Sequence, residues 1–299
     1  MQLLTNLAGF AVALMVGLPA FAIDWPPQAR RMAIHVEIGD WGTAQTQDIE
    51  KVLGSVAEVL LPYFSQRASD RIVVQYSRQG PQVLFEKSGG GAYRVFLSVQ
   101  DTRWDQFAYQ FSHELCHIFT NFEHREPSRD GSIRGHQWFE ETLCEAVSLF
   151  ALNRLASKWE RSPPFPGWND YAPAFRDYAR RLLSAEHRRL PPNESIAAWY
   201  RENREDLGRN PYLREKNEQL AVRLLPLLEN APGSLQAIAY LNLEESIFPG
   251  SFKAYLESWY RCCPEEYRPF ISQVITLFEE GDGTGRAAMA LTASRDLMN

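Results

Sequence analysis

The segment His113-Glu114-Leu115-Cys116-His117 has the residue types and spacing of a metal-dependent hydrolytic site. Residues four apart on a helix lie on one face, so His113 and His117 would present two imidazoles side by side. Glu114 would stand next to them, where a carboxylate can act on a metal-held water. The pattern fixes only three positions, and by itself it fits ordinary surface or hydrogen-bonded histidines just as well. Its meaning depends on the surrounding elements.

The residues around this motif predict an amphipathic helix over 104–122. Its apolar positions recur at helical spacing and form one stripe, which contains Phe107, Phe111, Leu115 and Ile118. The two histidines point away from that stripe. We therefore expect one side of the helix to anchor in a core while the histidines face a cleft.

A catalytic zinc usually takes three protein ligands and leaves the fourth position open for water. A second helix predicted from Gln137 to Ser157 offers the third ligand. Its apolar stripe contains Leu143, Ala146, Val147 and Phe150. Glu141 and Glu145 lie on the opposite side of this helix, so either carboxylate could face the histidines.

At this point the chain resembles the gluzincin metallopeptidases, in which the histidine pair is followed, on a second helix, by a glutamate ligand in a Trp-x-Asn-Glu-like stretch. Trp138 and Glu141 match that stretch, whereas Glu140 replaces the asparagine. Glu140 therefore remains a rival ligand. Glu145 follows Glu141 by four residues and is suited to orient a ligating histidine.

The resemblance implies a Zn²⁺ ion held by His113, His117 and Glu141. It also implies peptide-bond hydrolysis by a zinc-activated water, with Glu114 as general base and acid. Two other functions stay open: a zinc-dependent hydrolase acting on a non-peptide or cell-wall amide, and a non-catalytic scaffold stabilised by zinc.

Other zinc schemes fit the sequence less well. In the metzincin extension the glycine would fall at Thr120 and the third histidine at Glu123, and His124 is one place off. In gluzincins a tyrosine that opens a helix donates a hydrogen bond to the oxyanion, and Tyr212 is similar in position. Tyr200 and His136 are alternatives for that role.

The order of predicted elements gives an α+β fold. Strands are predicted over 32–37, 72–77, 83–86 and 93–99 and a helix over 45–64, before the motif helix. Zincins resemble one another in having an edge strand before that helix, along which an extended peptide pairs. The strand 93–99 could be this edge or an internal strand.

From Pro163 onward the pattern turns helical. Helices are predicted over 171–185, 212–228, 235–241, 251–261 and 265–279. We therefore expect a zincin-like catalytic lobe with a mixed sheet over residues 23–160 and an all-helical C-terminal lobe over residues 161–299.

The amino terminus predicts export. A twelve-residue apolar run from Leu7 to Leu18 is followed by Pro19-Ala20-Phe21-Ala22, which is typical of a signal peptide cut after an A-x-A-like site. Residues 1–22 would then be removed, and the mature protein would be secreted or periplasmic without stable membrane insertion.

Composition narrows the range of partners. The formal net charge of −6 argues against a nucleic-acid partner, for which a basic face is expected. A peptide or protein substrate is the partner that the motif favours, and the oligomeric state is undetermined. Cys116 and Cys144 each lie three residues beyond a proposed ligand, so they could form a disulfide that braces the site or could be two small buried residues.

Overall fold

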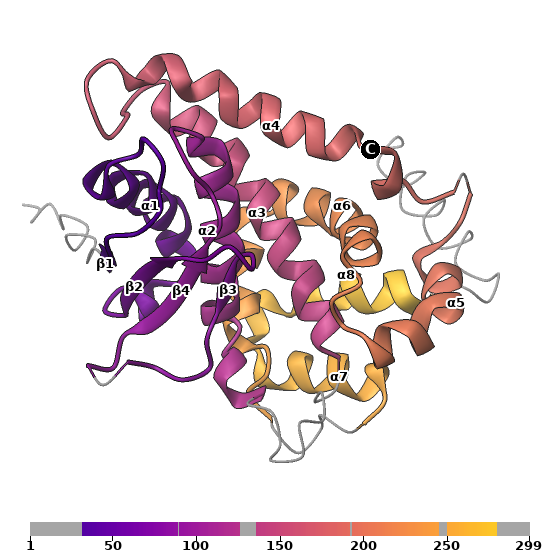
Figure 1. Ribbon diagram of the computed structural model, residues 1–299. Coiled ribbons are helices and arrows are strands. Elements are labelled where there is room, and N and C mark those ends of the chain that lie inside the picture. The colour runs from indigo at the N-terminus through magenta and orange to yellow at the C-terminus, as the bar shows by residue number, and fades with distance from the viewer. Residues whose placement is uncertain (1–31, 89, 126–135, 192, 245–249, 280–299) are drawn as a thin grey trace, which may run out of the picture.

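The computed structural model describes residues 32–88, 90–125, 136–191, 193–244 and 250–279. The predicted signal peptide, residues 1–22, lies outside them. The fold is α+β, with a small mixed sheet and many helices (Figure 1). Among the described residues, no helix combines the length and the apolar character that crossing a membrane requires.

The sheet has four strands in the order β1-β2-β4-β3. β1 (Ala33–Val36), β2 (Arg71–Tyr76) and β4 (Tyr93–Leu97) are parallel, and β3 (Gln82–Val83) pairs antiparallel with β4 at one edge. β-branched and aromatic residues in these strands favour the extended backbone. The predicted strand 93–99 is therefore internal. The edge strand is the short β3, because the chain turns back between Tyr76 and Tyr93.

Two helices cover this sheet and fix the histidine motif against it. α1 (Thr46–Leu60) connects β1 to β2 and packs on β1, α2 and α3. α2 (Trp104–Phe119) packs on β3, β4 and α1. All four residues of its predicted apolar stripe are fully buried. The stripe thus anchors α2 and leaves its other side for the site.

The helix α3 (Gln137–Trp159) runs through the middle of the molecule (Figure 1). It packs on α1 and α2 on one side and on α4 and α6 on the other. Its predicted apolar stripe is buried, but so are most of its other residues. The sequence predicted that α3 would bury one face. In the structure, helices pack on α3 from two sides, so most of its surface is buried.

The C-terminal half is helical, as predicted, with α4 (Ala172–Ser184), α5 (Ile196–Arg209), α6 (Arg214–Asn230), α7 (Phe252–Cys262) and α8 (Arg268–Glu279). Two details of the prediction were wrong. α5 was not predicted, because its sequence is mostly polar and its buried side is narrow. The predicted helix 235–241 belongs to a 3₁₀ segment, Pro232–Tyr240, after a Pro-Gly start.

One connected apolar core runs through both halves of the chain, from Met32 to Val274. α3 contributes to it along its whole length, so the sheet and the C-terminal helices are held against a shared helix. The division into lobes near residue 160 stays a prediction.

Candidate metal centre

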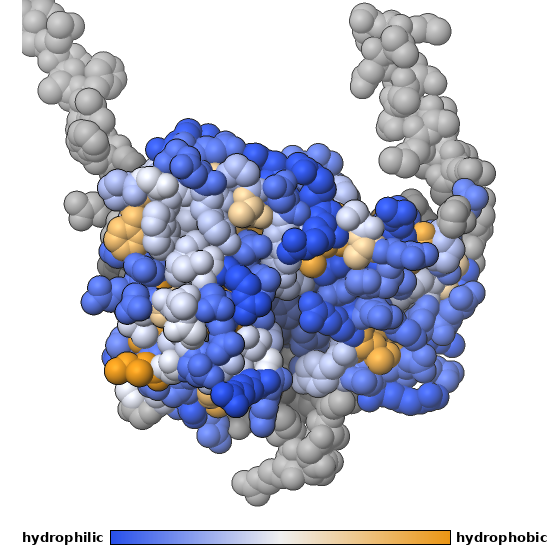
Figure 2. Space-filling view, turned by 45° about the horizontal axis from the view of Figure 1, so that its top comes forward, coloured by the Kyte–Doolittle hydropathy of each residue, from blue (hydrophilic) through white to orange (hydrophobic). Residues whose placement is uncertain are grey.

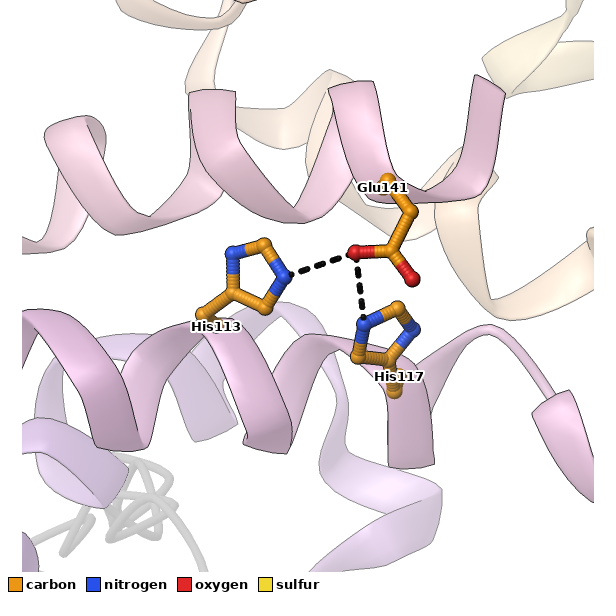
Figure 3. Close-up of side chains that lie close together, drawn as sticks. All are labelled: His113, His117 and Glu141. Atoms are coloured by element: carbon orange, nitrogen blue, oxygen red, sulfur yellow. Dashed lines mark hydrogen bonds and ion pairs between the residues drawn. The ribbon is translucent and has the colours of Figure 1, made fainter. Parts of the chain in front are cut away.

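α2 and α3 bring His113, His117 and Glu141 to a common point (Figure 3). One ligand atom from each residue lies within 4.8 Å of the other two. Glu141 Oε2 lies 3.1 Å from His113 Nε2 and 3.5 Å from His117 Nε2. The two imidazoles rise from one helix and the carboxylate descends from the next, so the tertiary contact between α2 and α3 creates the group.

The spacing of these atoms fits a divalent metal. Ligand atoms about 2.1 Å from a tetrahedral zinc lie roughly 3.4 Å from one another. The two measured separations, 3.1 and 3.5 Å, lie close to that value. Two imidazoles and one carboxylate are also a donor set that zinc accepts in catalytic sites. The third pair, His113 and His117, lies within 4.8 Å. The residues present therefore offer a donor set that could hold a divalent ion such as zinc.

Glu140 is the neighbour of Glu141 in the sequence, but it contacts a different atom of His117. Its Oε1 lies 2.7 Å from Nδ1 of His117, the ring nitrogen opposite the one that faces Glu141. Its Oε2 accepts a 2.7 Å hydrogen bond from Asn242 Nδ2, and Asn242 Oδ1 in turn accepts one from Tyr255. Glu140 is 2% exposed. It is thus a buried partner of the imidazole and does not join the group of three.

Glu145 has the corresponding place beside the other imidazole. Its Oε2 lies 3.8 Å from His113 Nδ1 and accepts a 2.5 Å hydrogen bond from Tyr109. Its Oε1 lies 2.6 Å from Arg188 Nη1. Each histidine therefore has a carboxylate near its Nδ1, which leaves Nε2 directed toward Glu141. A carboxylate behind the ring of a ligating histidine is the arrangement by which metal sites fix its tautomer.

The acid–base properties of the group follow from burial and mutual charge. Burial by itself lowers the pKa of His117, but the carboxylates of Glu141 and Glu140 outweigh it and hold that pKa well above its ordinary value. Burial lowers the pKa of His113, but its hydrogen bond to Glu141 helps to outweigh burial, and the pKa is also raised. Burial opposes the ionised form of Glu141, yet the two histidines hold its pKa far below the ordinary value. Without a metal, protonated imidazoles therefore balance the negative charge of Glu141.

Glu114 lies one residue beyond His113 and beneath the sheet edge. It is 4% exposed, and burial raises its pKa above 4.5 although the neighbouring histidines lower it. The main chain of Val83, in the edge strand β3, also interacts with its carboxylate. A carboxylate with a raised pKa is suited to take up and return a proton near neutral pH.

A cleft of 810 Å³ opens over this group. The β3 region from Gly80 to Phe85 forms one wall, α2 and α3 form the floor, and the start of α6 forms part of the other wall. The volume is within the range of small-molecule and peptide sites. On the face seen in Figure 2, the surface is predominantly hydrophilic and its apolar residues are scattered.

Of the three predicted oxyanion donors, Tyr212 is among the described residues that line the cleft, and Tyr200 and His136 are not. Tyr200 stacks on Trp138, and His136 Nε2 lies 3.0 Å from Gly250 O. Tyr212 accepts a 2.8 Å hydrogen bond from Gln137 Nε2. Its own hydroxyl hydrogen is therefore not used in this bond.

Cys116 and Cys144 are free thiols, and both are fully buried. They lie against each other, since a side-chain hydrogen bond with Cys116 and burial together raise the pKa of Cys144 well above 9.0. Of the two alternatives, the structure shows two small buried residues and no bridge, although the two positions do meet. The pair fills the interface between α2 and α3 below the site.

Three residues that support the histidines had no signal in the sequence. Tyr109 precedes the motif on α2, Arg188 belongs to a short 3₁₀ turn, and Asn242 follows the 3₁₀ segment. Arg188 and Asn242 lie far from the motif along the chain, so only the fold brings them near it. Asn242 has a positive φ of 61°, a backbone state that asparagine tolerates better than most residues.

The group of three and its two supporting carboxylates thus form a buried, hydrogen-bonded centre at the base of an open cleft. No protein-family model and no curated protein sequence matches this chain.

Proposed function

We propose that this protein is a zinc-dependent peptidase of the gluzincin type. The observation that carries the proposal is the convergence of His113, His117 and Glu141 within 4.8 Å, with the buried Glu114 beside them. A site that served only to hold zinc for stability would have no need for an adjacent base or for an open cleft. Catalysis accounts for both features.

The wall of the cleft supports a peptide as the substrate. β3 is an edge strand, and Leu84 N–H donates to Arg94 O in β4. Because main-chain groups alternate in direction along an antiparallel strand, those of Val83 point away from β4. Its main-chain N–H is directed to Glu114, and its C=O, on the same side, can accept from an added strand. An extended peptide can therefore hydrogen-bond to this edge as an added strand. Its scissile bond would then lie above the histidines.

The proposed reaction adds water across the peptide bond. A bound zinc ion would supply Lewis acidity, which lowers the pKa of water and polarises the carbonyl group. Glu114 takes one proton from the attacking water as the carbon–oxygen bond forms. It then gives that proton to the leaving nitrogen as the carbon–nitrogen bond breaks. The Tyr212 hydroxyl is the group in the cleft suited to donate to the developing oxyanion.

Export is part of the proposal. The apolar run and the small residues before Ile23 support removal of residues 1–22, which would give a secreted or periplasmic enzyme. The amino-terminal sequence of the protein recovered from outside the expressing cells tests this directly. We expect it to begin at Ile23.

The decisive test compares the zinc-loaded protein with its Glu114→Gln variant on a diverse peptide library, with and without chelator. We expect the wild type to cleave peptides and the chelator to abolish cleavage. The variant should bind one equivalent of metal and lose about 10²- to 10⁴-fold in turnover, because only the proton carrier is removed. Full activity in the variant would reject the role of Glu114. Tight zinc binding with no cleavage of any peptide would favour the hydrolase of another amide or the scaffold.

A further inference from the structure

Arg214 is the one lysine or arginine among the described residues that line the cleft. It begins α6 on the wall opposite β3, two residues after Tyr212. Its side chain is 73% exposed and forms part of the cleft lining. The other charged groups of the lining, the histidines aside, are carboxylates. Arg214 is thus the one permanently cationic side chain in the lining that an anionic group of a ligand could meet.

The guanidinium group is held in place by a buried acid. Arg214 Nε lies 2.7 Å from Oε1 of Glu218, whose side chain is 5% exposed. Hydrogen bonding and charge from Glu218 raise the pKa of Arg214 despite partial burial. Among the described residues no partner is seen for its Nη1 and Nη2 groups. An arginine held through Nε and free at both terminal nitrogens can bind a carboxylate in bidentate fashion.

Glu218 has further basic partners besides Arg214. Its Oε1 also lies 2.8 Å from Arg188 Nη2, and its Oε2 lies 2.6 Å from His187 Nε2. Arg188 is 1% exposed and also pairs with Glu145. Arg188 and Arg214 together balance the two acids, Glu145 and Glu218. Arg214 takes part through its Nε alone, so its Nη groups are not used in this network.

We infer that Arg214 is a specificity-determining residue that selects substrates with a carboxylate group at a fixed distance from the cleaved bond. The inference rests on the proposed peptidase function and names its substrate class. The carboxylate can come from two sources, an Asp or Glu side chain or the free C-terminus of the peptide. Both present the same planar pair of oxygens to the guanidinium.

The test uses peptide pairs that differ only in this group. One pair has a free C-terminal acid or a C-terminal amide, and the other has Glu or Gln at each position around the cleavage site. For the preferred source, we expect kcat/KM to be about 10- to 100-fold higher for the acid than for its neutral counterpart, as for a charge-assisted hydrogen bond. The pair that shows this ratio identifies the source.

Arg214→Gln should reduce that ratio to near one, and Arg214→Lys should give an intermediate ratio because it keeps the charge without the paired donors. Arg209→Gln is the matched control. Arg209 is 72% exposed, also pairs with a glutamate four residues away, and lies outside the cleft lining. It should keep the wild-type ratio. Metal content and melting temperature, measured for each variant, detect any disturbance of Glu218.

A binding arm separates this inference from the peptidase proposal. Glu114→Gln protein loaded with zinc is titrated with the acid and neutral peptides by calorimetry, and Glu114→Gln/Arg214→Gln is titrated in parallel. Tighter binding of the acid peptide, lost in the double variant, supports the role of Arg214 even if no peptide is cleaved. Equal binding of acid and neutral peptides, or an acid preference that survives Arg214→Gln, overturns it.

Discussion

Glu140 Oε1 lies 2.7 Å from Nδ1 of His117, while Glu141, the next residue in the chain, lies 3.5 Å from Nε2 of the same ring. Adjacent carboxylates thus approach opposite nitrogens of one imidazole. If Nε2 holds the metal, Glu140 fixes the tautomer and the orientation of the ring from behind. By this geometry Glu140 supports the imidazole and Glu141 is the proposed metal ligand. Substitutions at each of the two glutamates can test this difference.

Glu140→Gln should weaken metal affinity by about 10- to 100-fold, as loss of a carboxylate behind a ligating histidine typically does. The side chain keeps its shape, so the fold should persist. Competition with a chromophoric chelator measures the affinity. Glu141→Gln, measured alongside, should cost much more because a ligand is lost. Equal losses in the two variants would make Glu140 a ligand after all.

His113→Ala should remove both metal and activity, because two protein ligands do not hold zinc firmly. Elemental analysis of the purified protein, covering zinc, iron and manganese, measures the metal content. His35→Ala is the control, since His35 is 72% exposed and lies on β1 with Glu50 as its partner. The control should keep its metal. Stoichiometric metal in His113→Ala would refute the proposed ligand set.

Arg188→Ala should reduce the free energy of unfolding by about 3–5 kcal/mol, because it leaves buried carboxylates without their shared cation. Arg188 is 1% exposed and lies 2.6 Å from Glu145 and 2.8 Å from Glu218. Urea denaturation measures the change. Arg209→Ala, which breaks an exposed pair, should cost about 0–1 kcal/mol. A small effect of Arg188→Ala would mean that solvent reaches this network.

The pH dependence of stability should differ between the metal-free and zinc-loaded protein. The pKa of His117 is raised above its ordinary value of 6.5, so its stabilising contribution is complete below that pH and is lost as the pH rises through the raised pKa. The pKa of Glu141 is lowered, so its contribution is present above 4.5 and is lost only in strong acid. The metal-free protein should therefore become less stable above about pH 6.5.

Zinc needs neutral imidazoles, so its stabilising effect should grow over the same range. Melting temperatures of the chelated and zinc-loaded protein between about pH 6 and pH 9 measure the difference. We expect the gap between the two to widen as the pH rises. A constant gap would show that the histidines do not exchange protons for the metal.

Much of the fold was predictable because local patterns sufficed. The stripe through Phe107, Phe111 and Leu115 predicted a helix with the histidines on its free side, and all three are fully buried. The predicted strands and most helices agree with the structure to within a few residues. The polar helix α5 escaped prediction because its few buried residues give too weak a pattern. The short strand predicted over 83–86 corresponds to β3 (Gln82–Val83), whose bounds were shifted because a two-residue strand has no periodicity of its own.

The sequence by itself determined the pair of histidines and the base, because positions four apart on one helix share a face whatever the rest of the chain does. It favoured Glu141 as the third ligand by resemblance but left Glu140 as a rival. Neighbouring residues on a helix point about 100° apart, so the choice depends on how α3 is rotated against α2. Only the tertiary packing sets that rotation. The same packing brings Arg188, Asn242 and Arg214 to the site from distant parts of the chain.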